Sequence, residues 1–110
     1  MANNFKSFTL ANVGVTDSAI YTGPSSTQTT IIGLNLANKL STSINANVRL
    51  KNSDTSQTVY IVKDAPIPTG SSLVPVGGEQ KLVMLHNDVL YLSSSDSNSI
   101  DASMSVLEIT

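Results

Sequence analysis

The sequence has no cysteine and no tryptophan, and only 13% of its 110 residues carry a charge. The absence of cysteine excludes a disulfide scaffold, a thiol nucleophile and zinc ligation through sulfur. Charged residues make up about 25% of an ordinary globular domain, so the polar surface here must rely on other groups. Serine, threonine and asparagine supply them. Because threonine packs well on pleated sheets and serine and asparagine suit turns, this composition favours β-structure.

Clustered basic residues and long apolar runs are also lacking. The six lysines and arginines are scattered along the chain and the net charge is −2, so no basic stripe is available for nucleic acid. The N-terminal sequence lacks the apolar core of a secretion signal, and no window reaches the roughly 18 apolar residues of a membrane-spanning helix. We therefore expect no nucleic-acid partner, no membrane partner and synthesis in a cytoplasm. The small net charge is compatible with self-assembly.

The length fits one domain, since domains cluster around 100–150 residues. We predict a single domain over residues 1–110, with residues 1–6 as a candidate extended N-terminal arm. No segment has a sustained apolar period of 3.6 residues, so no helix is predicted.

Apolar and polar residues alternate along most of the chain, which is typical of half-buried strands. The segment 44–51 alternates most regularly, and its apolar face is Ile44, Ala46, Val48 and Leu50. The segment 58–63 is apolar on both faces near its middle, which predicts a central strand.

Two further segments have less simple patterns. In residues 29–38, Ile32 is expected to share a face with Leu34 and Leu36, with Ile31 on the opposite face. In residues 100–109, one face holds Ile100, Ala102, Met104 and Val106, and the apolar side then switches to Leu107 and Ile109. This switch indicates a β-bulge or a strand end that is buried against a partner.

Turn signals separate these segments at intervals of roughly 8–14 residues, which is the rhythm of a β-sandwich. They are Gly23-Pro24, Asn52-Ser53-Asp54, Pro66 with Pro68 and Gly70, Gly77-Gly78, His86-Asn87-Asp88 and Asp96-Ser97-Asn98. We therefore predict an all-β fold, namely an antiparallel β-sandwich, jelly-roll-like or immunoglobulin-like, of about eight or nine short strands.

The single histidine, His86, stands beside Asn87 and Asp88, and this group has two interpretations. His86 and Asp88 would share one face of an extended strand, as in part of a metal or acid–base site. A zinc site needs three or four ligands, and the chain has no second histidine. Asparagine and aspartate favour tight turns, so we interpret residues 86–88 as the bend of a hairpin. We predict no catalytic residue, no metal ligand and no cofactor.

The two phenylalanines, Phe5 and Phe8, lie near the N-terminus. Either a first strand uses both rings to close one end of the sandwich, or this segment docks on a neighbouring subunit, because aromatic residues often anchor interfaces. With Leu107 and Ile109 they are the candidate assembly contacts of the chain.

Several stretches carry a resemblance to a known group of proteins. They include the turn at residues 67–73 (IPTGSSL), the segment 77–82 (GGEQKL) and the serine-rich approach to the last strand. Together with the polar N-terminal start they span nearly the whole chain, which resembles small virion structural proteins of tailed bacteriophages, especially the large phages of marine cyanobacteria. The resemblance implies a non-enzymatic capsid decoration or cement subunit in the virion, made in the host cytoplasm. Its partners would be further copies of itself and the major capsid protein, and a neck, tail or fibre-base component is the alternative.

Two other classes of function stay open. A carbohydrate-binding module would use Tyr21, Tyr60 and Tyr91 to stack on sugars, although the large face of tryptophan is missing. A hydrolase would need a nucleophile near His86, and the chain contains no G-x-S-x-G motif.

Overall fold

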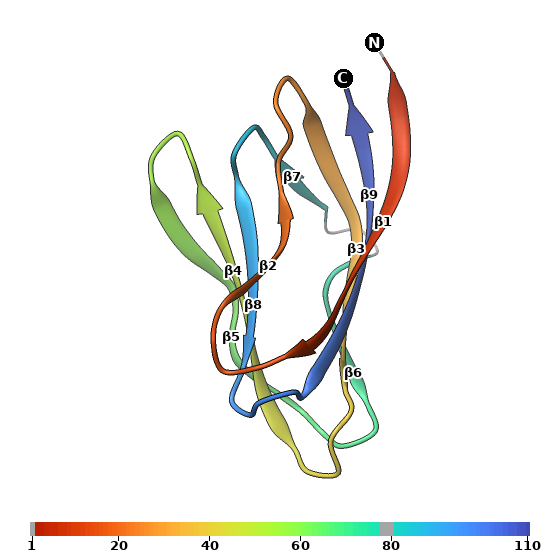
Figure 1. Cartoon of the computed structure of the whole chain (residues 1–110), viewed down its shortest axis with the longest axis vertical. Coiled ribbons are helices and arrows are strands. Elements are labelled where there is room, and N and C mark those ends of the chain that lie inside the picture. The colour runs from red at the N-terminus through yellow and green to blue at the C-terminus, as the bar shows by residue number, and fades with distance from the viewer. Residues whose placement is uncertain (1, 78–80) are drawn as a thin grey trace.

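The computed structural model describes residues 2–77 and 81–110 and places them in two antiparallel sheets that face each other (Figure 1). The strands of sheet 1, in spatial order, are β1 (Asn3–Val13), β9 (Ile100–Ile109), β3 (Gln28–Asn38) and β6 (Ser72–Val76), with β7 (Leu82–Met84) also paired to β3. Those of sheet 2 are β2 (Ser18–Thr22), β8 (Val89–Ser94), β4 (Ile44–Asn52) and β5 (Gln57–Ile67). The prediction of an all-β antiparallel sandwich is confirmed. The described residues include no helix that could cross a membrane.

The strands pair from the two ends of the chain inwards. β1 pairs with β9, β2 with β8, β3 with both β6 and β7, and β4 with β5. β6 and β7 contact different parts of β3 and so fill one strand position between them. The chain is therefore a long antiparallel hairpin wound into two sheets, which is the topology of a jelly roll. Of the two sandwich types predicted, the jelly-roll-like one is correct.

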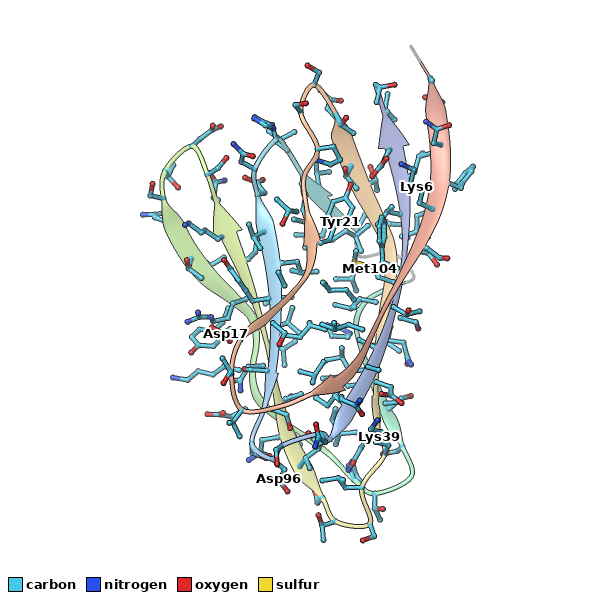
Figure 2. All side chains as sticks on the ribbon, in the orientation of Figure 1. Lys6, Asp17, Tyr21, Lys39, Asp96 and Met104 are labelled. Carbon is cyan, nitrogen blue, oxygen red and sulfur yellow. The ribbon has the colours of Figure 1, made fainter. Side chains whose placement is uncertain are left out.

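The core lies between the sheets and is formed by the inward residues of both (Figure 2). The predicted alternation is confirmed in β4 and β9, where every second residue is buried over most of the strand. The largest fully buried side chains are almost all aliphatic, as in Leu34, Leu36, Leu90, Leu92 and Ile100. Because the inner faces of a sandwich interdigitate, branched aliphatic residues can fill most of this space.

In β3 the predicted assignment of residues to faces was wrong at one position. Ile31 is fully buried, whereas Ile32 is half-buried on the outer side. The register with β9 shifts between Ile31 and Gly33, so Ile32 is the extra residue of a β-bulge. Leu34 then returns to the inner face. Alternation alone could not locate this bulge, because two neighbouring isoleucines satisfy either face.

β5 lies at the edge of sheet 2, so the prediction of a central strand over residues 58–63 was wrong. Val59 and Tyr60 are each 49% exposed. The strand also carries features that protect an open edge, namely two register shifts against β4, a proline at Pro66, and the charged residues Lys63 and Asp64. Apolar residues on both faces of β5 therefore reflect exposed surface rather than burial on two sides.

The bend at residues 86–87 is confirmed, but it does not join a hairpin. β7, which precedes it, belongs to sheet 1, and β8, which follows it, belongs to sheet 2. The turn thus carries the chain from one sheet to the other. Asn87 has a φ of 66°, in the left-handed region that asparagine tolerates well.

Both chain termini lie at the same end of the sandwich (Figure 1). Ala2 and Thr110 exchange two backbone hydrogen bonds of 3.0 and 2.9 Å, and β1 is paired with β9 from Asn3 onwards. The described part of the candidate arm, residues 2–6, therefore runs beside β9 as the start of an edge strand. Its contact with a neighbouring subunit stays a prediction.

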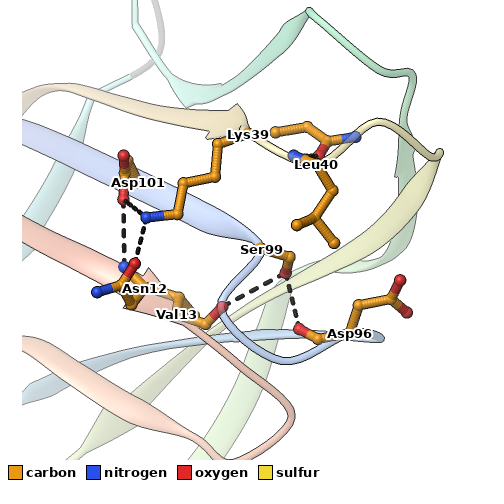
Figure 3. A network of polar contacts seen from close by, with 8 residues as sticks. Asn12, Val13, Lys39, Leu40, Asp96, Ser99 and Asp101 are labelled. Atoms are coloured by element: carbon orange, nitrogen blue, oxygen red, sulfur yellow. Dashed lines mark hydrogen bonds and ion pairs between the residues drawn. The ribbon is translucent and has the colours of Figure 1, made fainter.

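The opposite end of sheet 1 is held by a network of polar contacts (Figure 3). Lys39 Nζ lies 3.0 Å from the Asp101 carboxylate and also contacts the side chain of Asn12. The Asn12 backbone N–H donates to the same carboxylate at 3.1 Å. These two donors lower the pKa of Asp101 below its usual range. They tie β1 to β9 where the ladder between these strands is interrupted, after Leu10.

Candidate assembly surface

The outer face of sheet 1 brings together three of the four predicted assembly residues. Phe5 and Leu107 are direct cross-strand partners on β1 and β9, and Ile109 lies two residues further along β9 on the same face. Phe5 is 76% exposed, while Leu107 and Ile109 are half-buried. The alternation of side chains along paired strands accounts for this grouping.

Phe8 lies apart from this group, because its side chain points into the sandwich. Its ring meets the ring of Tyr21 edge-on, with centroids 5.0 Å apart and an interplanar angle of 67°. The interpretation in which both phenylalanines close the sandwich is therefore right for Phe8 and wrong for Phe5. Phe5 and Phe8 are three positions apart. Because side chains alternate between the two faces of a strand, an odd offset sends the two rings to opposite faces.

A row of cross-strand partners crosses sheet 1 at the level of Phe5. Phe5 pairs with Leu107, Leu107 with Thr30, and Thr30 with Val83. Val83 is 56% exposed. Direct cross-strand neighbours approach to about 5 Å, so this apolar row (residues 5, 107, 30 and 83) is a continuous surface. Sequence reasoning missed Thr30 and Val83 because the register of distant strands cannot be read from the chain.

The outer face of sheet 1 carries almost no charge. Of the outward-facing residues of β1, β3 and β9 that the structure describes, only Asp101 is charged, and it is paired with Lys39. The outer face of sheet 2 differs, since Arg49 and Lys51 alternate outwards from β4. Removing water from an uncharged face costs less free energy than removing it from a charged one, so the face of sheet 1 suits contact with another macromolecule better than that of sheet 2 does.

Glu108 explains why the apolar side of β9 switches near its end. Its side chain takes the inward position between Leu107 and Ile109 and is only 4% exposed. The predicted bulge was wrong here, because β9 stays in register with β1 through these residues. The carboxylate accepts hydrogen bonds from the Tyr21 hydroxyl at 2.6 Å and from Lys6 Nζ at 2.8 Å.

This buried cluster joins the two sheets. The Tyr21 hydroxyl, on β2 of sheet 2, lies 2.6 Å from Glu108 and 2.8 Å from the hydroxyl of Thr29, both in sheet 1. The hydrogen bonds from Lys6 and Tyr21 lower the pKa of Glu108 in spite of its burial. Burial and the neighbouring carboxylate raise the pKa of Tyr21 to about 12. At neutral pH the cluster therefore holds an ionised carboxylate and a neutral phenol, and its role is structural.

At the turn between the sheets, the side chain of Asp88 binds backbone N–H groups and not the side chain of His86. Its carboxylate accepts hydrogen bonds from the N–H of Leu85 at 3.0 Å and the N–H of Ser53 at 2.9 Å. Burial opposes ionisation of Asp88, but these bonds outweigh it and lower its pKa. His86 is exposed. Among the described residues no three histidine, aspartate or glutamate side chains are grouped so that they could hold a metal.

The three tyrosines do not form a common platform for sugars. Tyr21 is buried, whereas Tyr60 and Tyr91 lie on either side of Arg49 in the ladder of sheet 2. The guanidinium carbon of Arg49 lies 5.8 Å from the centre of the Tyr60 ring, and Lys63 Nζ lies 5.3 Å from it. A sugar that stacked on Tyr60 would compete with these cations.

A shallow hollow lies on the outer face of sheet 1, further along the strands from the apolar row. It has a volume of about 410 Å³, and its walls include Thr9, Ala11, Asn35, Asp101 and Ser103. Small side chains on three neighbouring strands create it. This β1–β9–β3 hollow and the exposed ring of Phe5 thus lie on the same face of the same sheet.

No protein-family model matches the chain, and no curated protein matches it. Solved structures do share its fold. A protein of Bacillus endospore appendages, described as a family of disulfide-linked pili, aligns with a TM-score of 0.57 at 11% identity, over 99% of this chain and 87% of that chain. VP2 of infectious bursal disease virus, in a subviral particle, aligns with a TM-score of 0.54 at 14% identity, over 96% of this chain.

These likenesses establish the fold alone, since the identities are so low. The chain spans about a third of the viral VP2 chain, of which 32% is covered. A pentameric capsid protein from metagenomic phage sequences has a TM-score of only 0.39, which supports no argument about this chain. The β-sandwich predicted from the sequence is thus a fold that also occurs in a viral capsid protein and in a pilus protein.

Proposed function

We propose that this protein is a non-enzymatic structural subunit of a virion, of the tailed-bacteriophage type that its sequence resembles. A fold hosts many functions, so the proposal must stand on the surface and not on the jelly roll alone. The observation that carries it is the nearly uncharged outer face of sheet 1, on which Phe5 is 76% exposed beside Leu107, in a row that ends at Val83. A contiguous apolar surface on a small domain marks a site of contact with another macromolecule.

Within the virion, the position we propose is that of a capsid decoration or cement subunit. The partner would be the major capsid protein, contacted through the apolar row, the sheet edges and the N-terminal segment, together with further copies of this chain. A shell offers many equivalent sites to a small domain with one flat face. A neck, tail or fibre-base component would use the same face at few sites.

A filament subunit is a second candidate, favoured by one specific observation. The pilus protein of Bacillus endospore appendages matches along 87% of its own length, so the two domains have nearly the same extent. That protein is described as disulfide-linked, whereas this chain has no cysteine. Copies of this chain in a filament would therefore have to associate without disulfide links.

The test is the copy number of this polypeptide in purified particles of the virus that encodes it, measured by quantitative mass spectrometry against the major capsid protein. A number comparable with that of the capsid protein supports a decoration subunit. A small number that matches the symmetry of the neck or tail supports the alternative position. Absence of the chain from the particles would refute the virion proposal.

A glycan-array screen with the purified chain tests the carbohydrate-binding alternative. Because Tyr21 is buried and Tyr60 lies beside two cations, we expect no binding. Binding that is lost in a Tyr60→Ala variant and kept in a Tyr21→Phe variant would favour a sugar-binding function instead.

A further inference from the structure

The outer edge of β1 is open, and its hydrogen-bonding groups can be assigned from the ladder to β9. Ala2 and Thr110 exchange both of their backbone hydrogen bonds, and the register is then unbroken from Asn3 to Leu10. In an antiparallel ladder such pairs alternate with pairs whose N–H and C=O groups point away from the neighbouring strand. The backbone groups that face the open edge are therefore those of Asn3, Phe5, Ser7 and Thr9.

The other described edge strands are less suited to pairing. β5 has two register shifts, a proline and two adjacent charged residues, β2 is five residues long with a shift of its own, and β6 and β7 are short and separate. From Asn3 to Leu10, β1 has no shift and no proline. Its one charged residue there, Lys6, contacts the buried Glu108. Natural proteins rarely leave so regular an edge uncovered.

We propose that a second copy of this chain covers this edge, through antiparallel pairing of β1 with β1 about a two-fold axis. Since no other described edge is both long and regular, the matching edge for β1 is β1 itself. A two-fold axis satisfies the same groups on both copies at once. The inference deepens the proposed structural role, on which it rests, by naming the partner and the contact.

Charge and length select the register of this pairing. An axis at Lys6 would set two lysines directly opposite each other, which destabilises paired strands. An axis at Phe5 would pair only residues 3–7 of the regular stretch, whereas an axis at Ser7 would pair residues 4–10. An axis at Ser7 places Phe5 opposite Thr9 of the second copy and Lys6 opposite Phe8. In this register the backbone N–H and C=O groups that face the open edge of β1 form about six hydrogen bonds between the copies.

The same register gives Phe5 a place to bind. Thr9, the residue opposite Phe5, lines the β1–β9–β3 hollow of about 410 Å³ together with Ala11, Asn35 and Ser103. An aromatic ring reaches both the direct and the diagonal neighbours across a strand pair. Each copy would thus cover the hollow of the other with the ring of Phe5. The two apolar rows would then lie on one side of a continuous sheet, facing a common surface.

The test uses the full chain in solution and no virion, so its failure is distinct from failure of the copy-number test. At about 100 μM, where an association with a micromolar Kd is nearly complete, wild type is expected at twice the chain mass by light scattering. That mass is twice 11.6 kDa. Ser7→Lys and Ser7→Glu should each be monomeric, because like charges meet at the axis, and an equal mixture of the two should restore the dimer. Val15→Lys, at a 64% exposed position between β1 and β2, is the matched control and should remain dimeric.

A cysteine-scanning experiment tests the register, and it is clean because the chain has no cysteine of its own. Ser7→Cys should form a disulfide-linked dimer on mild oxidation, since the two copies of residue 7 face each other. Thr9→Cys should not, because its two copies lie roughly 13 Å apart, at about 3.3 Å per residue along the strand. A monomeric wild type, a Ser7→Lys variant with the same mass as wild type, or equally fast crosslinking of both cysteine variants would overturn the proposal.

Discussion

Replacing Tyr21 with phenylalanine removes one hydroxyl from the cluster that joins the two sheets and leaves the ring in place against Phe8. The hydroxyl donates to the buried Glu108 carboxylate at 2.6 Å and contacts the hydroxyl of Thr29 at 2.8 Å. A hydrogen bond to a charged group contributes about 1.5–3 kcal/mol, and a buried partner left without it adds a desolvation cost. Lys6 still neutralises Glu108 at 2.8 Å in the variant. We therefore expect Tyr21→Phe to lower the free energy of unfolding by about 2–3 kcal/mol.

Urea denaturation followed by far-ultraviolet circular dichroism at pH 7 measures this loss. The midpoint should fall without a change in the slope, because the surface exposed on unfolding is the same. Tyr60→Phe is the matched control. The hydroxyl of Tyr60 makes no hydrogen bond to any described residue, and its side chain is largely exposed, so its loss should change stability by less than about 0.5 kcal/mol.

The pH dependence gives the same prediction an independent readout. The pKa of Tyr21 is raised from 10.0 to about 12, so the folded protein binds this proton more tightly than the unfolded chain does. The corresponding stability is complete below pH 10 and is lost as the pH rises towards 12, by up to about 3 kcal/mol at 1.4 kcal/mol per unit. Tyr21→Phe should lack this alkaline loss.

Two results would refute the reasoning about Tyr21. One is a loss below about 0.5 kcal/mol at pH 7, which would mean that the hydroxyl contributes no more than an exposed one. The other is a tyrosinate absorbance titration in which wild type and Tyr21→Phe do not differ near pH 12. The expected titration has a late step near pH 12 that is missing in Tyr21→Phe.

Three further predictions concern the turn between the sheets and the outer face. A Cβ on Gly23 would overlap the carbonyl oxygen of Leu85, so Gly23→Ala should cost about 3 kcal/mol in urea denaturation. Gly33→Ala, whose Cβ would meet its nearest neighbour at 3.8 Å, should cost much less, and equal losses would contradict this. Asp88→Asn should cost about 2 kcal/mol at pH 7, because it weakens two backbone hydrogen bonds to a charged acceptor. That difference should shrink as the pH falls below about 4, since the wild-type carboxyl has a lowered pKa and its contribution is lost on protonation. Leu107→Asp should leave the fold intact and prevent incorporation into particles, while Val15→Asp, at an exposed position, should change neither the fold nor incorporation. Incorporation of both variants would show that the apolar row is not part of the contact.

The two phenylalanines show where sequence reasoning about the surface ends. Their aromatic character and their position near a terminus indicated a contact site, and Phe5 does lie exposed on the outer face. Phe8 instead packs on Tyr21, because residues three positions apart on one strand point to opposite faces. The sequence could not show this, since it did not reveal that a single strand runs through both phenylalanines. The pairing of Phe5 with Leu107 joins positions about a hundred residues apart in a chain of 110, and no local pattern encodes it.

The misassigned strands have a common physical cause. Burial on two sides and exposure on two sides both permit apolar residues on both faces, so the sequence of β5 could not distinguish a central strand from an edge. The doubled isoleucine of β3 could not locate its bulge for a similar reason. Glu108 looked like a break in the apolar face, yet it continues the alternation, because Lys6 and Tyr21 make a buried carboxylate tolerable there.

The sequence by itself determined the class of this protein. Its period-two alternation, its turn residues and its lack of charge require β-strands with one apolar face, and such strands are stable only as two packed layers. The tertiary structure alone decided which strands became edges, which residues met across them, and where the apolar row and the hollow formed. Those features depend on pairings between distant segments, and the free energy of such pairings comes from contacts that exist only after the chain has folded.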